Sequence, residues 1–120
     1  MRGAPGWGLL LALLACGGGE KSPVSALLAD PAAIERGRLV FVGTCGAYCH
    51  ALGAERRDAP DLFDCEWKHG GSDADLFRTI SQGVAGTRMP AFAGALPEKD
   101  ADLWKVIAFL RANSRCTARQ

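Results

Sequence analysis

The chain has 120 residues, with 14 Lys and Arg against 13 Asp and Glu, and five of its residues are cysteines. A chain of this length forms one domain at most, and the balanced charge excludes the strongly basic surface of a nucleic-acid-binding protein. No nucleic-acid partner is therefore expected. Five cysteines in so short a chain indicate an oxidising compartment or a bound cofactor.

The N-terminal region has the pattern of a bacterial lipoprotein. An apolar run over residues 9–14 follows a single charge at Arg2. This run is too short to span a bilayer, which takes about 20 apolar residues, but it has the length of a signal-peptide core. The sequence Leu13-Leu-Ala-Cys16 resembles a lipobox. We expect residues 1–15 to form a signal peptide and Cys16 to carry a lipid; ordinary cleavage that leaves a free thiol is the alternative.

Residues 16–29 are expected to form a flexible tether, because three glycines follow Cys16 and are themselves followed by polar residues and Pro23. The folded domain is expected over residues 30–120. The lipid would hold this domain in the cell envelope, facing the periplasm. Gly17 stands where Asp is typical of retention in the inner membrane, so the outer membrane is favoured.

Two helices are predicted from their end signals. The first runs over residues 31–42, because Asp30 is a suitable N-cap and Pro31 a suitable first residue. The second begins after the N-cap Ser72 and ends at Gly83.

A third helix is predicted over residues 98–112, after Pro97. Its apolar residues recur at i, i+3, i+4 and i+7, and they predict a buried face made of Leu103, Val106, Ile107 and Leu110. Its solvent-exposed side is expected to hold Glu98, Asp102 and Lys105. Because no segment alternates with a period of two, the fold class is all-α.

The motif that carries chemistry is Cys45-Gly-Ala-Tyr-Cys49-His50. Covalent haem c attaches at Cys-x-x-Cys-His, where two thiols add to the haem vinyl groups and the adjacent imidazole binds the iron. Three residues separate the cysteines here instead of two. We expect Cys45 and Cys49 to form thioethers and His50 to be an axial ligand, and the wider spacing leaves it open whether both thioethers form.

Two other arrangements of these side chains remain open. Cysteines at i and i+4 on a helix lie near the Cα separation of a disulfide, so Cys45 and Cys49 could pair with each other. A zinc site could also form from Cys45, Cys49, His50 and His69. The direct adjacency of His50 to Cys49 makes such a shared tetrahedral centre awkward.

The second axial ligand is expected to be Met89. The only other methionine is Met1, which leaves with the signal peptide, and Pro90 favours an extended backbone at Met89. A thioether is a soft, neutral ligand, and His/Met ligation raises the reduction potential of a haem. A core methionine is the alternative role for Met89, and His69 is the alternative ligand.

From residue 31 to residue 113 the chain resembles a class I cytochrome c. Gly37 and Phe41 match the glycine and the aromatic residue of the family's N-terminal helix, and residues 103–110 resemble its C-terminal helix. The resemblance implies a small helical domain wrapped around one haem c, in which these two helices cross. Gly37 costs about 1 kcal/mol of helix propensity relative to Ala, and a close crossing at that point would make this cost tolerable.

Two loops carry the rest of the resemblance. Residues 59–62, Ala-Pro-Asp-Leu, resemble the family's loop after the haem motif. This implies that the Pro60 carbonyl accepts a hydrogen bond from His50 and orients its ring. Residues 87–90, Thr-Arg-Met-Pro, resemble the loop that carries the distal ligand, which supports Met89 in that role.

Cys65 and Cys116 remain once the motif cysteines and Cys16 have been assigned. In an oxidising compartment two leftover thiols usually pair, so a Cys65–Cys116 disulfide is expected. Such a bond would hold the C-terminal tail against the middle of the chain.

If His50 and Met89 both bind the iron, no coordination position is open for a substrate. The sequence therefore predicts a one-electron carrier and not an enzyme. Its expected partners are redox proteins, with a dehydrogenase or a quinol-oxidising complex as donor and a terminal oxidase or reductase as acceptor. The alternatives are a haem enzyme or gas sensor with an open distal position, and a thiol-redox or structural lipoprotein without haem.

Overall fold

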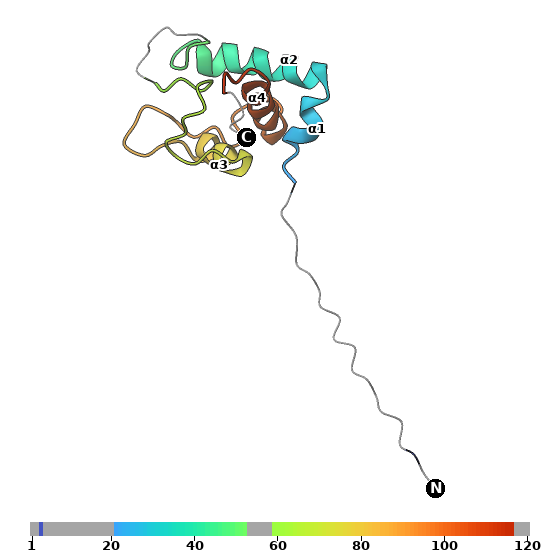
Figure 1. Ribbon diagram of the computed structural model, residues 1–120. Coiled ribbons are helices and arrows are strands. Elements are labelled where there is room, and N and C mark those ends of the chain that lie inside the picture. The colour runs from blue at the N-terminus through green and yellow to red at the C-terminus, as the bar shows by residue number, and fades with distance from the viewer. Residues whose placement is uncertain (1–2, 4–20, 53–58, 117–120) are drawn as a thin grey trace.

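The computed structural model describes residues 21–52 and 59–116, together with residue 3. In this part of the chain the regular elements are all helical, so the predicted all-α fold class is confirmed. They are α1 (Val24–Leu28), α2 (Pro31–Val40), the π-helix η1 (Phe41–Gly46), α3 (Asp73–Gln82) and α4 (Asp100–Ala112) (Figure 1). None of the described helices is long and apolar enough to cross a membrane. Cys16 and, apart from residue 3, the expected signal peptide lie outside the described residues.

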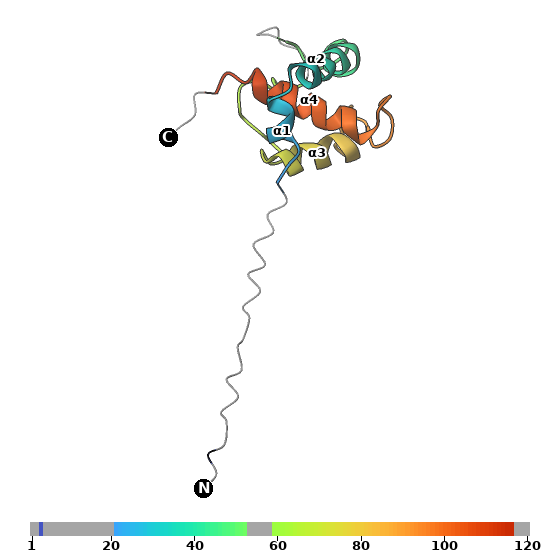
Figure 2. The same cartoon turned by 90° about the vertical axis from the view of Figure 1, so that its right-hand side faces the viewer.

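Helix α4 lies between α2 and α3 in both views of the domain (Figure 1, Figure 2). It contacts α1, α2 and α3. It begins at Asp100, two residues later than predicted, and its predicted apolar face is confirmed. The core is built around this helix, whose buried residues are Asp102, Leu103, Val106, Ile107, Ala108, Phe109 and Leu110.

The crossing of α2 and α4 is close because Gly37 has no side chain. A Cβ atom at Gly37 would lie 2.0 Å from the carbonyl oxygen of Lys105 and 3.1 Å from the Cβ of Phe109. Phe41, the first residue of η1, is fully buried beside this crossing. Its ring lies 5.7 Å from that of Phe63 and 5.5 Å from that of Phe109, measured between centroids. The close helix crossing expected at Gly37 is therefore confirmed.

Local signals set the start of α2 and both ends of α3 as predicted. The Asp30 side chain accepts a hydrogen bond of 3.0 Å from the N–H of Ala32. Ser72 caps α3 by accepting a bond of 3.0 Å from the N–H of Asp75. Gly83, with a φ of +70°, ends the same helix in a conformation that favours glycine.

The folded domain begins earlier than expected. The sequence predicts a tether as far as residue 29, whereas α1 lies within that range and contacts both α2 and α4. Val24 is only 2% exposed. A helix of five residues is too short to show a helical period in sequence, which is why it was not predicted. The described residues place the start of the domain near Val24 instead of Asp30.

Asp102 is buried, although it was expected to face solvent. Its two carboxylate oxygens accept hydrogen bonds of 2.8 Å each from the Arg36 guanidinium on α2. The backbone N–H of Glu98 donates to it as well, at 2.9 Å. Periodicity assigns a charged residue to the solvent side of a helix, and it cannot reveal a partner 66 positions away in the chain.

Candidate functional site

The first part of the site is the turn that carries Cys45, Cys49 and His50. Helix α2 passes into η1 at Phe41, so the helix predicted to end near residue 42 continues to Gly46 with a wider turn. The Cys45 carbonyl oxygen accepts bonds from the N–H of Cys49 at 3.1 Å and from the N–H of His50 at 2.9 Å. The second bond is of the i to i+5 type, and it accommodates the extra residue between the two cysteines.

His50 is 8% exposed, and a hydrogen bond to a carbonyl oxygen orients its ring. Its Nδ1 lies 2.9 Å from the carbonyl oxygen of Pro60. A carbonyl oxygen can only accept, so Nδ1 is the donor, and in the neutral imidazole Nε2 is then the nitrogen with a free lone pair. Metal-binding histidines commonly have this arrangement. The structure thus brings His50 and Pro60 together as the resemblance implied, while the ligation of iron by His50 stays a prediction.

Cys45 and Cys49 both have free thiols in the structure and are half-buried. They do not form the disulfide considered as an alternative. Burial raises the pKa of the Cys45 thiol to about 11, and the neighbouring Cys49 adds to the effect. Thiol-disulfide oxidoreductases need the opposite shift, because their thiolate must form readily near neutral pH. The environment of Cys45 therefore does not favour the thiol-redox alternative.

Met89 is half-buried in a tightly folded loop after α3. Its backbone N–H donates to Oγ1 of Thr87 at 3.1 Å, and its carbonyl oxygen accepts from the N–H of Val84 at 3.1 Å. Gly83 packs against the same segment, since a Cβ there would lie 2.7 Å from the Met89 carbonyl oxygen. These contacts hold the backbone of Met89 in place, as a ligand on a loop requires.

His69, the alternative ligand, is exposed and borders a surface hollow together with Arg78, Thr79 and Gln82. Across residues 21–52 and 59–116, no three His, Cys, Asp or Glu side chains gather closely enough to hold a metal ion. The zinc site considered for the motif cysteines and the two histidines is therefore not formed among the described residues.

The donor set of the described residues fits haem c. Two free thiols lie in the same turn as a buried imidazole whose Nδ1 is hydrogen-bonded to a carbonyl oxygen. The loop after α3 carries the thioether of Met89. Apolar side chains that are only partly buried adjoin the core of the same domain, where they could border a flat apolar group. They include Val42, Leu62, Trp67, Phe77, Ile80, Phe92 and Trp104.

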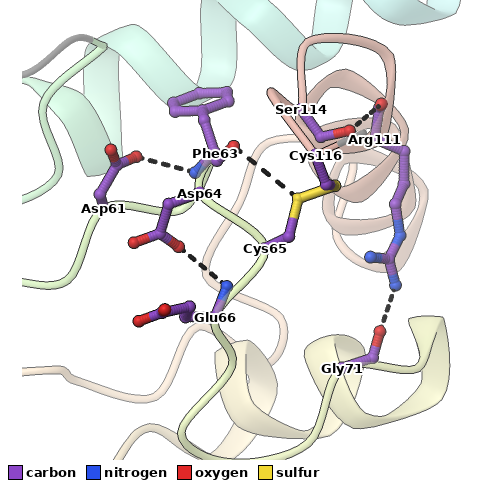
Figure 3. The surroundings of a disulfide bond; sticks show 9 residues. All are labelled: Asp61, Phe63, Asp64, Cys65, Glu66, Gly71, Arg111, Ser114 and Cys116. Carbon is purple, nitrogen blue, oxygen red and sulfur yellow. Dashed lines mark hydrogen bonds between the residues drawn. A yellow bond between two sulfur atoms is a disulfide. The ribbon is translucent and has the colours of Figure 1, made fainter. Parts of the chain in front are cut away.

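A disulfide joins Cys65 and Cys116 in the structure (Figure 3), with their Cα atoms 5.6 Å apart. Beside it, the N–H of Arg115 donates to the Phe63 carbonyl oxygen at 2.8 Å, and the Arg115 guanidinium pairs with Asp61. These contacts fasten the C-terminal tail to the loop before α3. That the purified protein carries this bond stays a prediction.

Sequence reasoning missed the pairing of Arg115 with Asp61. The two residues are 54 positions apart, and no local pattern links them. The only signal in the sequence was the position of Arg115 directly before a cysteine that was expected to pair.

Residues 32–110 match the family model described as cytochrome C oxidase, cbb3-type, subunit III. The chain belongs to this cytochrome c family. The matched range runs from α2 into α4 and includes the cysteine turn, Pro60 and Met89. The resemblance to a class I cytochrome c is thereby confirmed. A cytochrome c domain implies covalently bound haem c and a role in electron transfer.

Curated relatives agree with this membership. Cbb3-type cytochrome c oxidase subunit CcoP of Rubrivivax gelatinosus is 39% identical over 77 residues, which are 62% of this chain and 24% of the relative. Subunit FixP of Bradyrhizobium diazoefficiens is 44% identical over 64 residues, 51% of this chain and 21% of the relative. Subunit FixPc of Rhizobium leguminosarum bv. viciae is 44% identical over 71 residues, which are 56% of this chain and 24% of the relative. The chain thus matches at most about a quarter of the length of these relatives. No solved structure matches it with significance.

Proposed function

We propose that this chain is a monohaem c-type cytochrome that carries single electrons between redox proteins. The observation that carries the proposal is the buried His50, directly after two free cysteines, with Nδ1 hydrogen-bonded to the Pro60 carbonyl oxygen. The 120 residues contain one such motif, which supports one haem c.

Four side chains would hold the haem. Cys45 and Cys49 would form the thioethers, and His50 and Met89 would be the axial ligands. When bound, the haem supplies an iron that accepts and releases one electron. Pro60 keeps His50 in the tautomer that binds metal, and the contacts of the Met89 backbone hold the opposite ligand. With both axial positions filled, no substrate binds the iron, so the chain would be a carrier and not an enzyme.

The membrane anchor is part of the same proposal. Residues 1–15 would be removed as a signal peptide, and Cys16 would carry the lipid that anchors the domain on the periplasmic side. Gly17 favours the outer over the inner membrane. Because Val24 is already buried in the domain, the tether would be residues 16–23 instead of 16–29.

The proposed partners follow from the relatives, which are named as subunits of cbb3-type cytochrome c oxidase. A terminal oxidase is therefore the favoured electron acceptor, with a terminal reductase as the alternative. A dehydrogenase or a quinol-oxidising complex would be the donor. Since positive and negative side chains nearly balance, association would depend little on long-range charge steering.

Carbon monoxide binding to the reduced protein tests the axial ligation. The wild-type protein is expected to bind carbon monoxide slowly or not at all, because Met89 would fill the distal position. Met89→Leu keeps the side-chain volume but removes the sulfur, so rapid and complete binding is expected. The ferric form of this variant is also expected to lose the weak far-red band typical of methionine ligation.

His69→Gln is the matched control, since it removes the alternative ligand from an exposed position. It is expected to behave like the wild-type protein in both measurements. Rapid, full binding of carbon monoxide by the wild-type protein would instead favour the haem enzyme or gas sensor with an open distal side.

A further inference from the structure

We propose that Arg115 and the Cys65–Cys116 disulfide form a clamp that positions the hydrogen-bond acceptor of His50. The proposal rests on the haem ligation proposed above. It assigns to the tail after α4 an influence on the axial ligand, although no residue of that tail touches His50 among the described hydrogen bonds.

The acceptor lies in a segment without regular structure. Residues 59–68 contain no helix, so no helical hydrogen bonds fix the direction of the Pro60 carbonyl. That carbonyl belongs to the planar peptide unit that Pro60 shares with Asp61. Whatever holds Asp61 therefore restricts the direction in which the Pro60 oxygen points.

Asp61 is held from two sides. One carboxylate oxygen accepts a bond of 2.8 Å from the N–H of Phe63 (Figure 3), and the other pairs with the Arg115 guanidinium. Phe63 is 3% exposed, and its ring packs against those of Phe41 and Phe109. Phe63 is thus the point at which the loop is fixed to the core, and Arg115 is the second restraint on Asp61.

Arg115 depends on the disulfide for its position. Helix α4 ends at Ala112, so no helical hydrogen bond holds Arg115 itself. Two other links hold it in place. Its own backbone N–H donates to the Phe63 carbonyl oxygen at 2.8 Å, and the next residue, Cys116, is bonded to Cys65. The covalent bond keeps the guanidinium within reach of Asp61.

The clamp would act on the haem through the basicity of His50. A carbonyl that accepts from Nδ1–H strengthens electron donation from Nε2 to a metal, and hydrogen bonding to an axial ligand is one way in which a protein tunes haem potential. When the Pro60 carbonyl is released, this donation weakens and the reduced iron becomes relatively more stable. The reduction potential then rises.

The test uses the haem-loaded protein and two variants, Arg115→Leu and Cys65→Ser/Cys116→Ser. The midpoint potential is measured by redox titration, and solvent exchange of the His50 Nδ1 proton by NMR in the reduced state. Both variants are expected to raise the potential and to speed the exchange, while the far-red band of methionine ligation remains. Arg115→Lys keeps a positive charge opposite Asp61 and is expected to recover part of the shift.

Arg38→Leu is the matched control. Arg38 is a partly exposed arginine that pairs with Glu35 on the same helix at 2.6 Å. Its removal is expected to change neither the midpoint potential nor the proton exchange. Arg115→Leu retains the disulfide and keeps the test decisive if the double cysteine variant fails to fold.

A wild-type potential in Arg115→Leu, with haem bound, would overturn the clamp and leave the proposed function intact. Thiol labelling of both Cys65 and Cys116 in the oxidised, purified protein would overturn the clamp as well. A chain that binds no haem would overturn the proposed function, and the clamp with it.

Discussion

The pairing of Asp102 with Arg36 is the clearest case of a single residue whose environment differs from its sequence expectation. The carboxylate is fully buried and receives both guanidinium bonds from the crossing helix. The hydrogen bonds from Arg36 hold the pKa of Asp102 below its usual value, and they outweigh the opposing effect of burial. The ion pair therefore links α2 to the first turn of α4.

Asp102→Asn is expected to destabilise the protein by about 2 kcal/mol at pH 7. The carboxylate charge opposite Arg36 is lost, and the amide nitrogen that replaces one carboxylate oxygen cannot accept a hydrogen bond. The pKa of Asp102 is lower in the folded than in the unfolded chain, so the unfolded chain takes up the proton first as the pH falls. The stabilisation is therefore full above about pH 5 and is lost as the pH falls through the folded value. Urea unfolding between about pH 7 and pH 3 measures both effects.

Glu35→Gln is the control for Asp102→Asn, since it breaks an ion pair on the surface of α2. It is expected to change stability much less than Asp102→Asn does, because solvent-exposed ion pairs contribute little. Equal losses of unfolding free energy in the two variants would contradict the role given to Asp102. So would an Asp102→Asn variant whose unfolding free energy falls with pH as that of the wild-type protein does.

The close crossing of α2 and α4 depends on the absence of a side chain at Gly37. Gly37→Ala is expected to destabilise the domain by at least about 2 kcal/mol, although alanine favours a helix by about 1 kcal/mol. The reason is steric, because the new Cβ would lie 2.0 Å from the Lys105 carbonyl oxygen and must push the helices apart. Gly43→Ala is the control, because a Cβ there meets no atom within 4 Å. Thermal unfolding is expected to show a lower midpoint for Gly37→Ala alone.

Elements with local signals were predictable, and those made by distant contacts were not. Asp30, Ser72 and Gly83 act within one turn of their own helices, so the start of α2 and both ends of α3 follow from sequence. Helix α1 depends on burial of Val24 against later segments, and it was missed.

The same distinction holds for the candidate site. Its cysteines and His50 are adjacent in the chain, so the motif was visible in the sequence. The contact between Pro60 and His50 was expected only from family resemblance. The clamp at Arg115 depends on contacts between residues far apart in sequence, which no spacing rule reveals.

The molecule as a whole has a small helical core that a covalent haem would complete. The buried rings of Phe41, Phe63 and Phe109 join η1, the loop before α3, and α4. A domain of this size has a marginal core of its own. A haem packed against the partly buried apolar side chains would add apolar contact area to this core.

The proposed function depends on one haem that is bonded covalently to Cys45 and Cys49. The most direct test is the mass and absorption spectrum of protein matured in a host that attaches haem c, measured after denaturation and acid-acetone extraction. The wild-type protein is expected to be red, to keep its colour and to have the mass of the processed chain plus one haem. The Cys45→Ala/Cys49→Ala variant is expected to lose the colour and the added mass of the haem. A colourless wild-type protein, with the mass of the chain and lipid alone, would contradict the proposed function.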